Sequence, residues 1–208
     1  CFADALGRPD RHYRVDIALC GEGPDDKGPL DTNRVYTHHR PMKIGIISDV
    51  HSNIQALSTA FEYADNHGVD RMICLGDVVG YGADPNACLE QVIEVSDLIL
   101  AGNHDWASVG LEDPGFFNPV ALAAIQWTVH MLHEQNVARL HSYRPFEDEE
   151  GCRYAHSSPL EPDLWHYLFD PEDGWTALVQ TAHEMCFVGH SHRAFLCSAS
   201  QTTTLMRE

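Results

Sequence analysis

Positively charged side chains are scarce in this sequence of 208 residues. Lysine and arginine number 13 against 31 aspartate and glutamate residues, which gives a formal net charge of −18. Lys43 is the only lysine after residue 41. Because nucleic acids and anionic membranes bind proteins through basic surfaces, the composition excludes duplex nucleic acid and membrane as expected partners. A polyanionic substrate would need a bound metal ion to attract it.

Long apolar runs and paired cysteines are also lacking. No apolar run approaches the ~20 residues that a membrane-spanning helix needs. The seven cysteines include no Cys-x-x-Cys pair, and Cys74 and Cys186 lie inside apolar, strand-like runs. Cysteines of that kind are typical of core residues in a reducing compartment, so we expect a cytoplasmic protein. The composition leaves the oligomeric state open.

Residues 1–41 lack any sustained helical or strand period. They are rich in glycine, proline, aspartate and arginine, although residues 34–37 have the composition of a short strand. This pattern predicts a poorly ordered leader, followed by one compact domain over residues 42–208. The sequence assigns no function to the leader.

The next part of the chain alternates short apolar runs with helical patterns. The runs at 44–47, 71–75 and 98–101 predict strands, and helical patterns begin after Asn53 and at Pro85. Strand–helix–strand alternation predicts an α/β fold with mostly parallel central strands and helices on the faces of the sheet.

A longer helix is predicted to begin at Asn118-Pro119 and to continue toward residue 145. Its apolar stripe should pack against the core, and the segment of about 113–145 should form a helical cap that sets specificity. The stripe consists of Val120, Ala124, Trp127 and Met131.

The last part of the chain is less regular. The acidic run 147–150 indicates a surface turn, and strands are expected at 152–155 and 185–188. A helix is predicted near residues 175–183, and two short strands should follow around residues 195 and 203.

Each of the five strand-like runs is followed at once by residues that can bind metal ions. In an open α/β sheet, ligands bind at the carboxyl ends of the strands. One histidine at a strand end is more often a solvated or core residue, but five successive clusters favour a shared site. The candidate residues are Asp49, His51, Asp77, Asn103, His104, His156, His190 and His192.

The residue types suit divalent metal ions. Imidazole and carboxylate ligands favour manganese, iron, zinc or nickel over calcium, and the sequence offers no thiolate set. Two ions could share a bridging carboxylate such as Asp77. Two such ions against the carboxylates of Asp49 and Asp77 leave a net positive site, which would draw in a phosphate.

In this order the motifs resemble those of the calcineurin-like metallophosphoesterases. The motifs are Asp-x-His, Gly-Asp, Gly-Asn-His-Asp, a strand-end histidine and Gly-His-x-His, over residues 43 to about 196. The resemblance implies a four-layer α/β/β/α sandwich with a dinuclear centre, for which manganese is the leading candidate. Family chains usually continue past Gly-His-x-His, so the resemblance also implies a sheet truncated at the C-terminus.

The resemblance further implies a role for each candidate residue. Asp49, His51 and His192 would hold the first ion, Asp77 would bridge, and Asn103, His156 and His190 would hold the second. His104 would act as general acid to the leaving group or as a charge stabiliser, oriented by Asp105. On the residues alone, His104 could also be a further metal ligand or a helix N-cap contact.

The implied activity is hydrolysis of a phosphodiester or a small phosphorylated metabolite by attack of a metal-bridging hydroxide. Protein phosphatases of the superfamily and the symmetrical dinucleoside tetraphosphatases carry Gly-Asp-x-Val-Asp-Arg-Gly, whereas residues 76–82 read Gly-Asp-Val-Val-Gly-Tyr-Gly. Tyr81 replaces the arginine, which favours the small bacterial and archaeal phosphodiesterase branch. Two alternatives remain: an asymmetrical dinucleoside polyphosphate hydrolase, and a catalytically silent binding scaffold on the same fold.

Several aromatic residues could stack on a nucleobase near the site, although core or cap packing is the more usual role of such residues. They are Phe116, Phe117, Trp127, Trp165, Tyr167 and Trp175.

Overall fold

The computed structural model describes residues 18–20, 41–181 and 183–197. The first sheet has the order β1-β2-β3-β4, in which β1 (Ala18–Cys20) is antiparallel to β2 (Ile44–Ile47). The strands β3 (Arg71–Cys74) and β4 (Leu98–Ile99) continue the sheet in parallel. The predicted parallel core is therefore confirmed, and β1 adds an edge strand from residues 1–41, which lack a sustained strand period.

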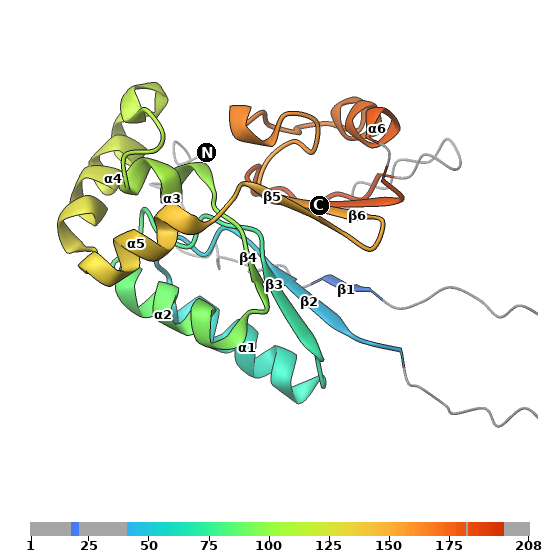
Figure 1. Ribbon diagram of the computed structural model, residues 1–208, viewed down its shortest axis with the longest axis horizontal. Coiled ribbons are helices and arrows are strands. Elements are labelled where there is room, and N and C mark those ends of the chain that lie inside the picture. Colours follow the sequence, from blue (N-terminus) through green and yellow to red (C-terminus); the bar gives the residue numbers. More distant parts are fainter. Residues whose placement is uncertain (1–17, 21–40, 182, 198–208) are drawn as a thin grey trace, which may run out of the picture.

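The second sheet has the order β5-β6-β7. A hairpin joins β5 (Phe146–Glu149) to β6 (Cys152–Ala155), and β7 (Met185–Val188) runs parallel to β6. Figure 1 shows the two sheets between helices, with α1 (Ile54–Asn66) and α2 (Pro85–Val95) on one side and α6 (Pro171–Gln180) on the other.

Alternation along the strands explains these layers. On β2, Ile47 packs with α1 and α2 in one apolar cluster, while its neighbour Ile46 packs with Tyr154 of β6 in another. On β3, Cys74 and Ile73 divide between the same two clusters. Because successive strand residues point to opposite faces, each central strand holds a helix layer on one side and the second sheet on the other. This arrangement is the four-layer α/β/β/α order.

Helices connect the two sheets. They are α3 (Asn103–Ser108), the 3-10 turn η1 (Pro114–Phe116), α4 (Pro119–Met131) and α5 (Glu134–Ser142), with η2 (Pro162–Leu164) after β6. The helices α1 and α4 begin where the sequence predicts, and side chains cap them: Asn53 accepts the N–H of Ala56, and Asn118 accepts the N–H groups of Val120 and Ala121.

The predicted core face of α4 is wrong. The helix buries Ala121, Ile125 and Thr128, whereas Val120 of the predicted stripe is 56% exposed and Trp127 is 41% exposed. The pattern misled because α4 has no acidic, lysine or arginine residue, and apolar side chains lie on nearly all of its sides.

The predicted single helix toward residue 145 is also divided. The backbone is extended at Leu132 and His133, between α4 and α5. Asn86 of α2 satisfies the backbone groups at the break, since its Nδ2 donates to the carbonyl of Met131 and its Oδ1 accepts from the N–H of His133. A partner 45 residues away in sequence thus ends α4.

The acidic run predicted as a turn belongs mostly to strand β5. The turn itself falls at Glu150 and Gly151, which both have positive φ. Two arginines pair with acidic side chains of the strand. Arg153 lies opposite Asp148 and donates to it, and Arg71 donates to Glu149 at 2.7 Å.

Other predicted strands lie at the limit of the described residues. Around residue 195 only Leu196 makes a β bridge, within the part of the chain that the structure describes. Residues 34–37 and 203 lie outside the described residues, as does most of the predicted leader.

Candidate metal centre

The predicted ligands come together at the carboxyl ends of the strands. The loop after β2 pairs with the loop after β3, because the N–H groups of Asp49 and His51 donate to the carbonyls of Gly76 (3.0 Å) and Asp77 (2.9 Å). Within the second sheet, the N–H of Gly189 donates to the carbonyl of His156 at 2.9 Å. The second sheet joins the loops of the first through the N–H of His190, which donates to Asp49 Oδ2 at 3.0 Å. The loops therefore form one hydrogen-bonded unit, as the position at a common sheet edge requires.

Much of this unit has a strained backbone. Five of the seven predicted ligands have left-handed φ angles: Asp49 (55°), His51 (48°), Asp77 (51°), His190 (65°) and His192 (51°). Non-glycine residues rarely adopt this conformation, and such strain is concentrated at functional sites where the surrounding structure enforces it. The clustering at these loops indicates that the placement of the side chains, rather than the intrinsic φ/ψ preference of the backbone, determines the local conformation.

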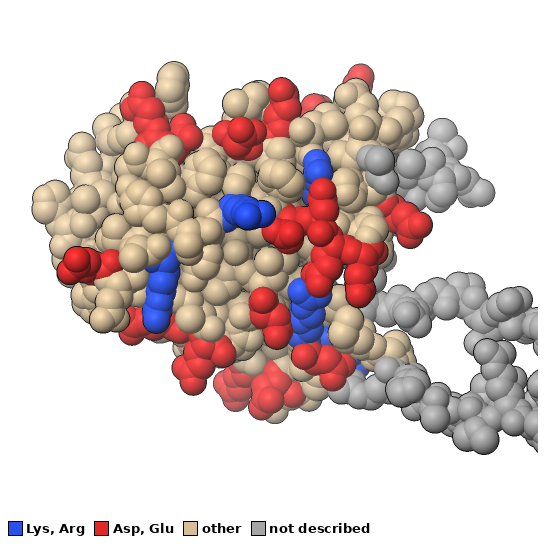
Figure 2. All heavy atoms as spheres, in the orientation of Figure 1, with Lys and Arg blue, Asp and Glu red and all other residues tan. Residues whose placement is uncertain are grey.

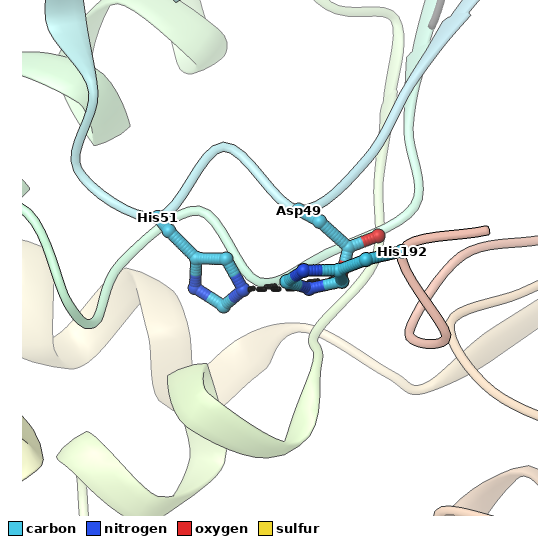
Figure 3. A group of neighbouring side chains, drawn as sticks. All are labelled: Asp49, His51 and His192. Carbon is cyan, nitrogen blue, oxygen red and sulfur yellow. Dashed lines mark hydrogen bonds and ion pairs between the residues drawn. The ribbon is translucent and has the colours of Figure 1, made fainter. Parts of the chain in front are cut away.

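The first group of side chains is formed by Asp49, His51 and His192 (Figure 3). His192 Nε2 lies 3.2 Å from Asp49 Oδ1 and 3.1 Å from His51 Nε2. Two imidazole nitrogens and a carboxylate oxygen converge here with the separations expected around a single cation.

The second group is formed by Asp77, His156 and His190. Asp77 Oδ2 lies 3.4 Å from His156 Nε2 and 3.6 Å from His51 Nε2, a residue of the first group. The other oxygen, Oδ1, accepts the N–H of His104 at 2.9 Å, which fixes the carboxylate. Asp77 therefore stands between the two groups, where a bridging ligand would stand.

Backbone carbonyls orient the imidazoles. The Nδ1 atoms of His51 and His156 face the carbonyls of Val79 (3.2 Å) and Leu75 (3.1 Å). A metal-binding histidine usually donates its other ring N–H to such an acceptor, so this arrangement leaves Nε2 free to bind. His190 has the reverse orientation. Its Nε2 faces the carbonyl of Trp165 at 2.9 Å, so its Nδ1 is the nitrogen that could bind a metal ion.

Three buried atoms of the predicted ligands lack a well-formed hydrogen bond: Asp49 Oδ1, Asn103 Oδ1 and His156 Nε2. The first and the last face only other predicted ligands, His192 at 3.2 Å and Asp77 at 3.4 Å. Buried polar atoms are nearly always satisfied, and an unpaired one requires an explanation. Each of these is the kind of atom that a divalent ion takes as a ligand. The residues therefore fit a pair of divalent ions.

The electrostatics keep the carboxylates charged. Burial alone would raise the pKa of Asp49, but the imidazoles of His192 and His156 outweigh it and lower that pKa to about 2. Burial likewise opposes ionisation of Asp77, and the charges of His156 and His104 hold its pKa well below the usual value. For His190, burial dominates and lowers the pKa to about 4, so the ring is neutral and able to bind a metal.

His104 lies among these groups, with its ligand atom in one cluster with those of His51 and Asp77. Its Nδ1 is buried without a hydrogen-bond partner and faces Gly80, where an added Cβ would lie 2.7 Å from that nitrogen. Two of the roles considered for His104, acid toward a substrate and further metal ligand, fit this geometry.

Asp105 does not orient the His104 ring as expected. Its Oδ1 accepts the N–H of Val79 and its Oδ2 accepts the N–H of Gly102, both at 3.0 Å. Burial raises the pKa of Asp105 to about 7. The side chain therefore fixes the backbone of the two loops that carry Asp77 and Asn103.

Two positions at the site were not identified from the sequence. The carbonyl of Trp165, a residue with φ of 54°, faces His190. Gly102 allows Asp77 to approach its backbone, since an added Cβ would collide with Asp77 Oδ1. A glycine directly before Asn103 could have indicated the close approach at Gly102. No sequence pattern indicates that the carbonyl of Trp165 would face a histidine.

The aromatic residues divide into two sets. Tyr167, Trp165 and Phe117 lie against His190, His156 and His104, with ring centroids 4.0, 6.0 and 4.9 Å apart. The other three are exposed and are not in the core: Phe116, Trp127 and Trp175.

Comparisons with known proteins agree with this fold. Residues 42–206 match the model of the calcineurin-like phosphoesterase superfamily domain. The chain is 38% identical over 160 residues to the uncharacterized protein MJ0912 of Methanocaldococcus jannaschii, covering 74% of this chain and 64% of that protein.

Two solved structures are also similar. One is a metallophosphoesterase from Sphaerobacter thermophilus, with a TM-score of 0.64 and 35% identity, covering 74% of this chain and 62% of that one. The other is hypothetical protein PH1004 from Pyrococcus horikoshii, with a TM-score of 0.58, 15% identity and coverage of 71% and 69%, which shows the fold alone. The chain spans under two thirds of the length of the first two relatives.

The fold and the site define a metallophosphoesterase domain. The chain belongs to the calcineurin-like phosphoesterase superfamily, as its motifs predicted. Among the described residues, no helix is long and apolar enough to cross a membrane.

Proposed function

We propose that this protein is a metal-dependent phosphoesterase that hydrolyses a phosphodiester or a small phosphorylated metabolite. The observation that carries the proposal is the position of Asp77, whose Oδ2 lies within 3.6 Å of His51 Nε2 and 3.4 Å of His156 Nε2. A carboxylate between two sets of imidazoles is the arrangement that a two-ion site requires.

The resemblance to the family and the two groups of side chains support the ligand roles. Asp49, His51 and His192 would hold one ion, and Asn103, His156 and His190 the other, with Asp77 shared. Two divalent ions bound in this way supply positive charge to the phosphate and make hydroxide available near neutral pH.

Residues of the chain account for the remaining requirements. His104 is 6% exposed and lies beside His51 and Asp77, so its ring can meet the oxygen that leaves the phosphorus. A proton or hydrogen bond from His104 at that oxygen would stabilise the departing alkoxide. Asp105 holds the two loops in register, and this is a positioning role.

The test uses the full chain stripped of metal and reloaded with Mn²⁺. Hydrolysis of bis-p-nitrophenyl phosphate and p-nitrophenyl phosphate should require the metal, and the ratio of the two rates reports preference for diester or monoester. Retention of two ions per chain without turnover of either compound would refute the proposal and would favour a binding scaffold on the same fold.

A further inference from the structure

A column of stacked side chains leads outward from the metal centre. The Tyr167 ring lies on His190, with centroids 4.0 Å apart and planes at 25°. Phe169 lies on Tyr167 at 4.8 Å and 6°, and the Arg193 guanidinium carbon lies 5.6 Å from the Phe169 centroid. A candidate metal ligand is thus linked through two aromatic rings to a cation.

The local backbone explains why the column forms. Tyr167 and Phe169 are 49% and 45% exposed, whereas Leu168 between them is 9% exposed. Alternation along an extended segment therefore places both rings on the same side of the chain. Arg193 follows His192 directly, and two residues later Phe195 packs closely against Gly174 of α6. The backbone of Arg193 is consequently held between His192 at the metal centre and Phe195 at α6.

Arg193 has no carboxylate partner within 4.0 Å among the described residues. Its contacts are the Phe169 ring and the Phe169 carbonyl, which lies 3.5 Å from Nη1. Arg71 and Arg153, by contrast, each pair with a carboxylate at 2.7 Å.

Two acidic side chains that follow Phe169 accept backbone N–H groups. Asp170 Oδ1 accepts the N–H groups of Glu172 and Asp173 at the start of α6, and Asp173 Oδ2 accepts the N–H of Phe169. On a chain of net charge −18, an exposed guanidinium at the outer end of this column, with no carboxylate partner among the described residues, is available to an external anion. Stacking on an aromatic ring limits its motion, and its planar donors match carboxylate and phosphate oxygens.

We propose that Arg193, held on Phe169, binds a second anionic group of the substrate. The substrate class is then a phosphate ester that carries a further phosphate or carboxylate some distance from the scissile phosphorus. This inference rests on the proposed function, because the scissile phosphate must occupy the metal centre. Arg193 is a specificity-determining residue in this scheme.

The test compares two ligands that differ in one charge, butylphosphonate and 4-phosphonobutyrate. Their binding to the full, metal-loaded chain is measured by calorimetry, which needs no turnover. The wild-type protein should bind the carboxylate-bearing compound about tenfold more tightly, as one charge-assisted contact allows. In Arg193→Ala the two affinities should become equal, and Arg193→Lys should retain part of the preference.

Lys43→Ala serves as the matched control. It removes one positive charge at the amino end of β2, the opposite end from the site, so the tenfold preference should remain. Equal affinities in the wild type, an unchanged ratio in Arg193→Ala or no binding of either phosphonate would each overturn the inference.

The two proposals fail in different ways. If the Arg193-dependent preference is present but no ester is hydrolysed, the proposed activity is wrong and the anion site stands. If bis-p-nitrophenyl phosphate is hydrolysed and the preference is absent, the activity stands and the role of Arg193 is wrong. Thermal unfolding of each variant shows whether the fold is intact.

Discussion

The loops of the metal centre and helix α4 lie close together in this molecule, and they are built in opposite ways. The loops bury imidazoles and carboxylates on a strained backbone, with His156 and Asp77 almost fully enclosed. Helix α4 has a relaxed backbone and exposes Val120 and Trp127. Figure 2, in the orientation of Figure 1, shows one face of the molecule, on which acidic side chains outnumber basic ones.

This contrast explains why the candidate ligands in the loops could be predicted from the sequence, whereas the buried face of α4 could not. Metal chemistry restricts each ligand position to a few residue types, so the motifs are informative. Hydrophobicity restricts α4 much less, because its apolar residues on both faces satisfy the same pattern. The following experiments test the two regions, from the largest expected effect to the smallest.

Removal of metal should have the largest effect. After chelation, hydrolysis of bis-p-nitrophenyl phosphate should fall to the uncatalysed background, because only the ions supply strong positive charge within the carboxylate and imidazole groups. Mn²⁺ should restore the rate, whereas Ca²⁺, which prefers oxygen ligands, should not. Full turnover in a sample without detectable metal would rule out the metal-dependent mechanism.

Asp77→Asn should empty both ion positions. The neutral amide keeps an oxygen for the N–H of His104 but loses the charge that faces both imidazole groups. Elemental analysis should find a loss of metal from both positions, and activity should fall with it. Asp65→Asn, the same change on the exposed surface of α1, should retain both ions. Two ions per chain in Asp77→Asn would contradict the bridge.

His104→Ala should reduce turnover by about 10²–10⁴-fold while both ions remain, because a general acid contributes about that much to the rate. Turnover and metal content are measured on the same preparation. Loss of an ion would instead identify His104 as a ligand. His141→Ala, which removes an exposed imidazole on α5, should change neither quantity.

A pair of substitutions in α4 tests the corrected core face. Ile125→Ala should lower the free energy of unfolding by about 2–5 kcal/mol, because Ile125 is 1% exposed and its truncation leaves a cavity. Val120→Ala, in the stripe first predicted to be buried, should change it by no more than about 0.5 kcal/mol. Chemical denaturation measures both values, and equal costs would restore the original prediction.

The same reasoning applies to the site residues, whose roles as metal ligands stay predictions. Six of the seven predicted ligands lie in the two groups at the centre, because each follows a strand that the sequence indicated. Asp105 was misassigned because the N–H groups that it accepts belong to Val79 and Gly102, and their directions depend on how two loops meet. Sequence proximity to His104 was a poor guide to its contacts.

By itself, the sequence determined the parallel core, the order of the motifs and the residues able to bind metal, because local periodicity and ligand chemistry leave few alternatives. The tertiary structure alone decided which face of α4 is buried, that Asn86 ends this helix and that the acidic run 147–150 mostly forms a strand. Each of these outcomes depends on a partner brought close only by folding, and no local pattern records it.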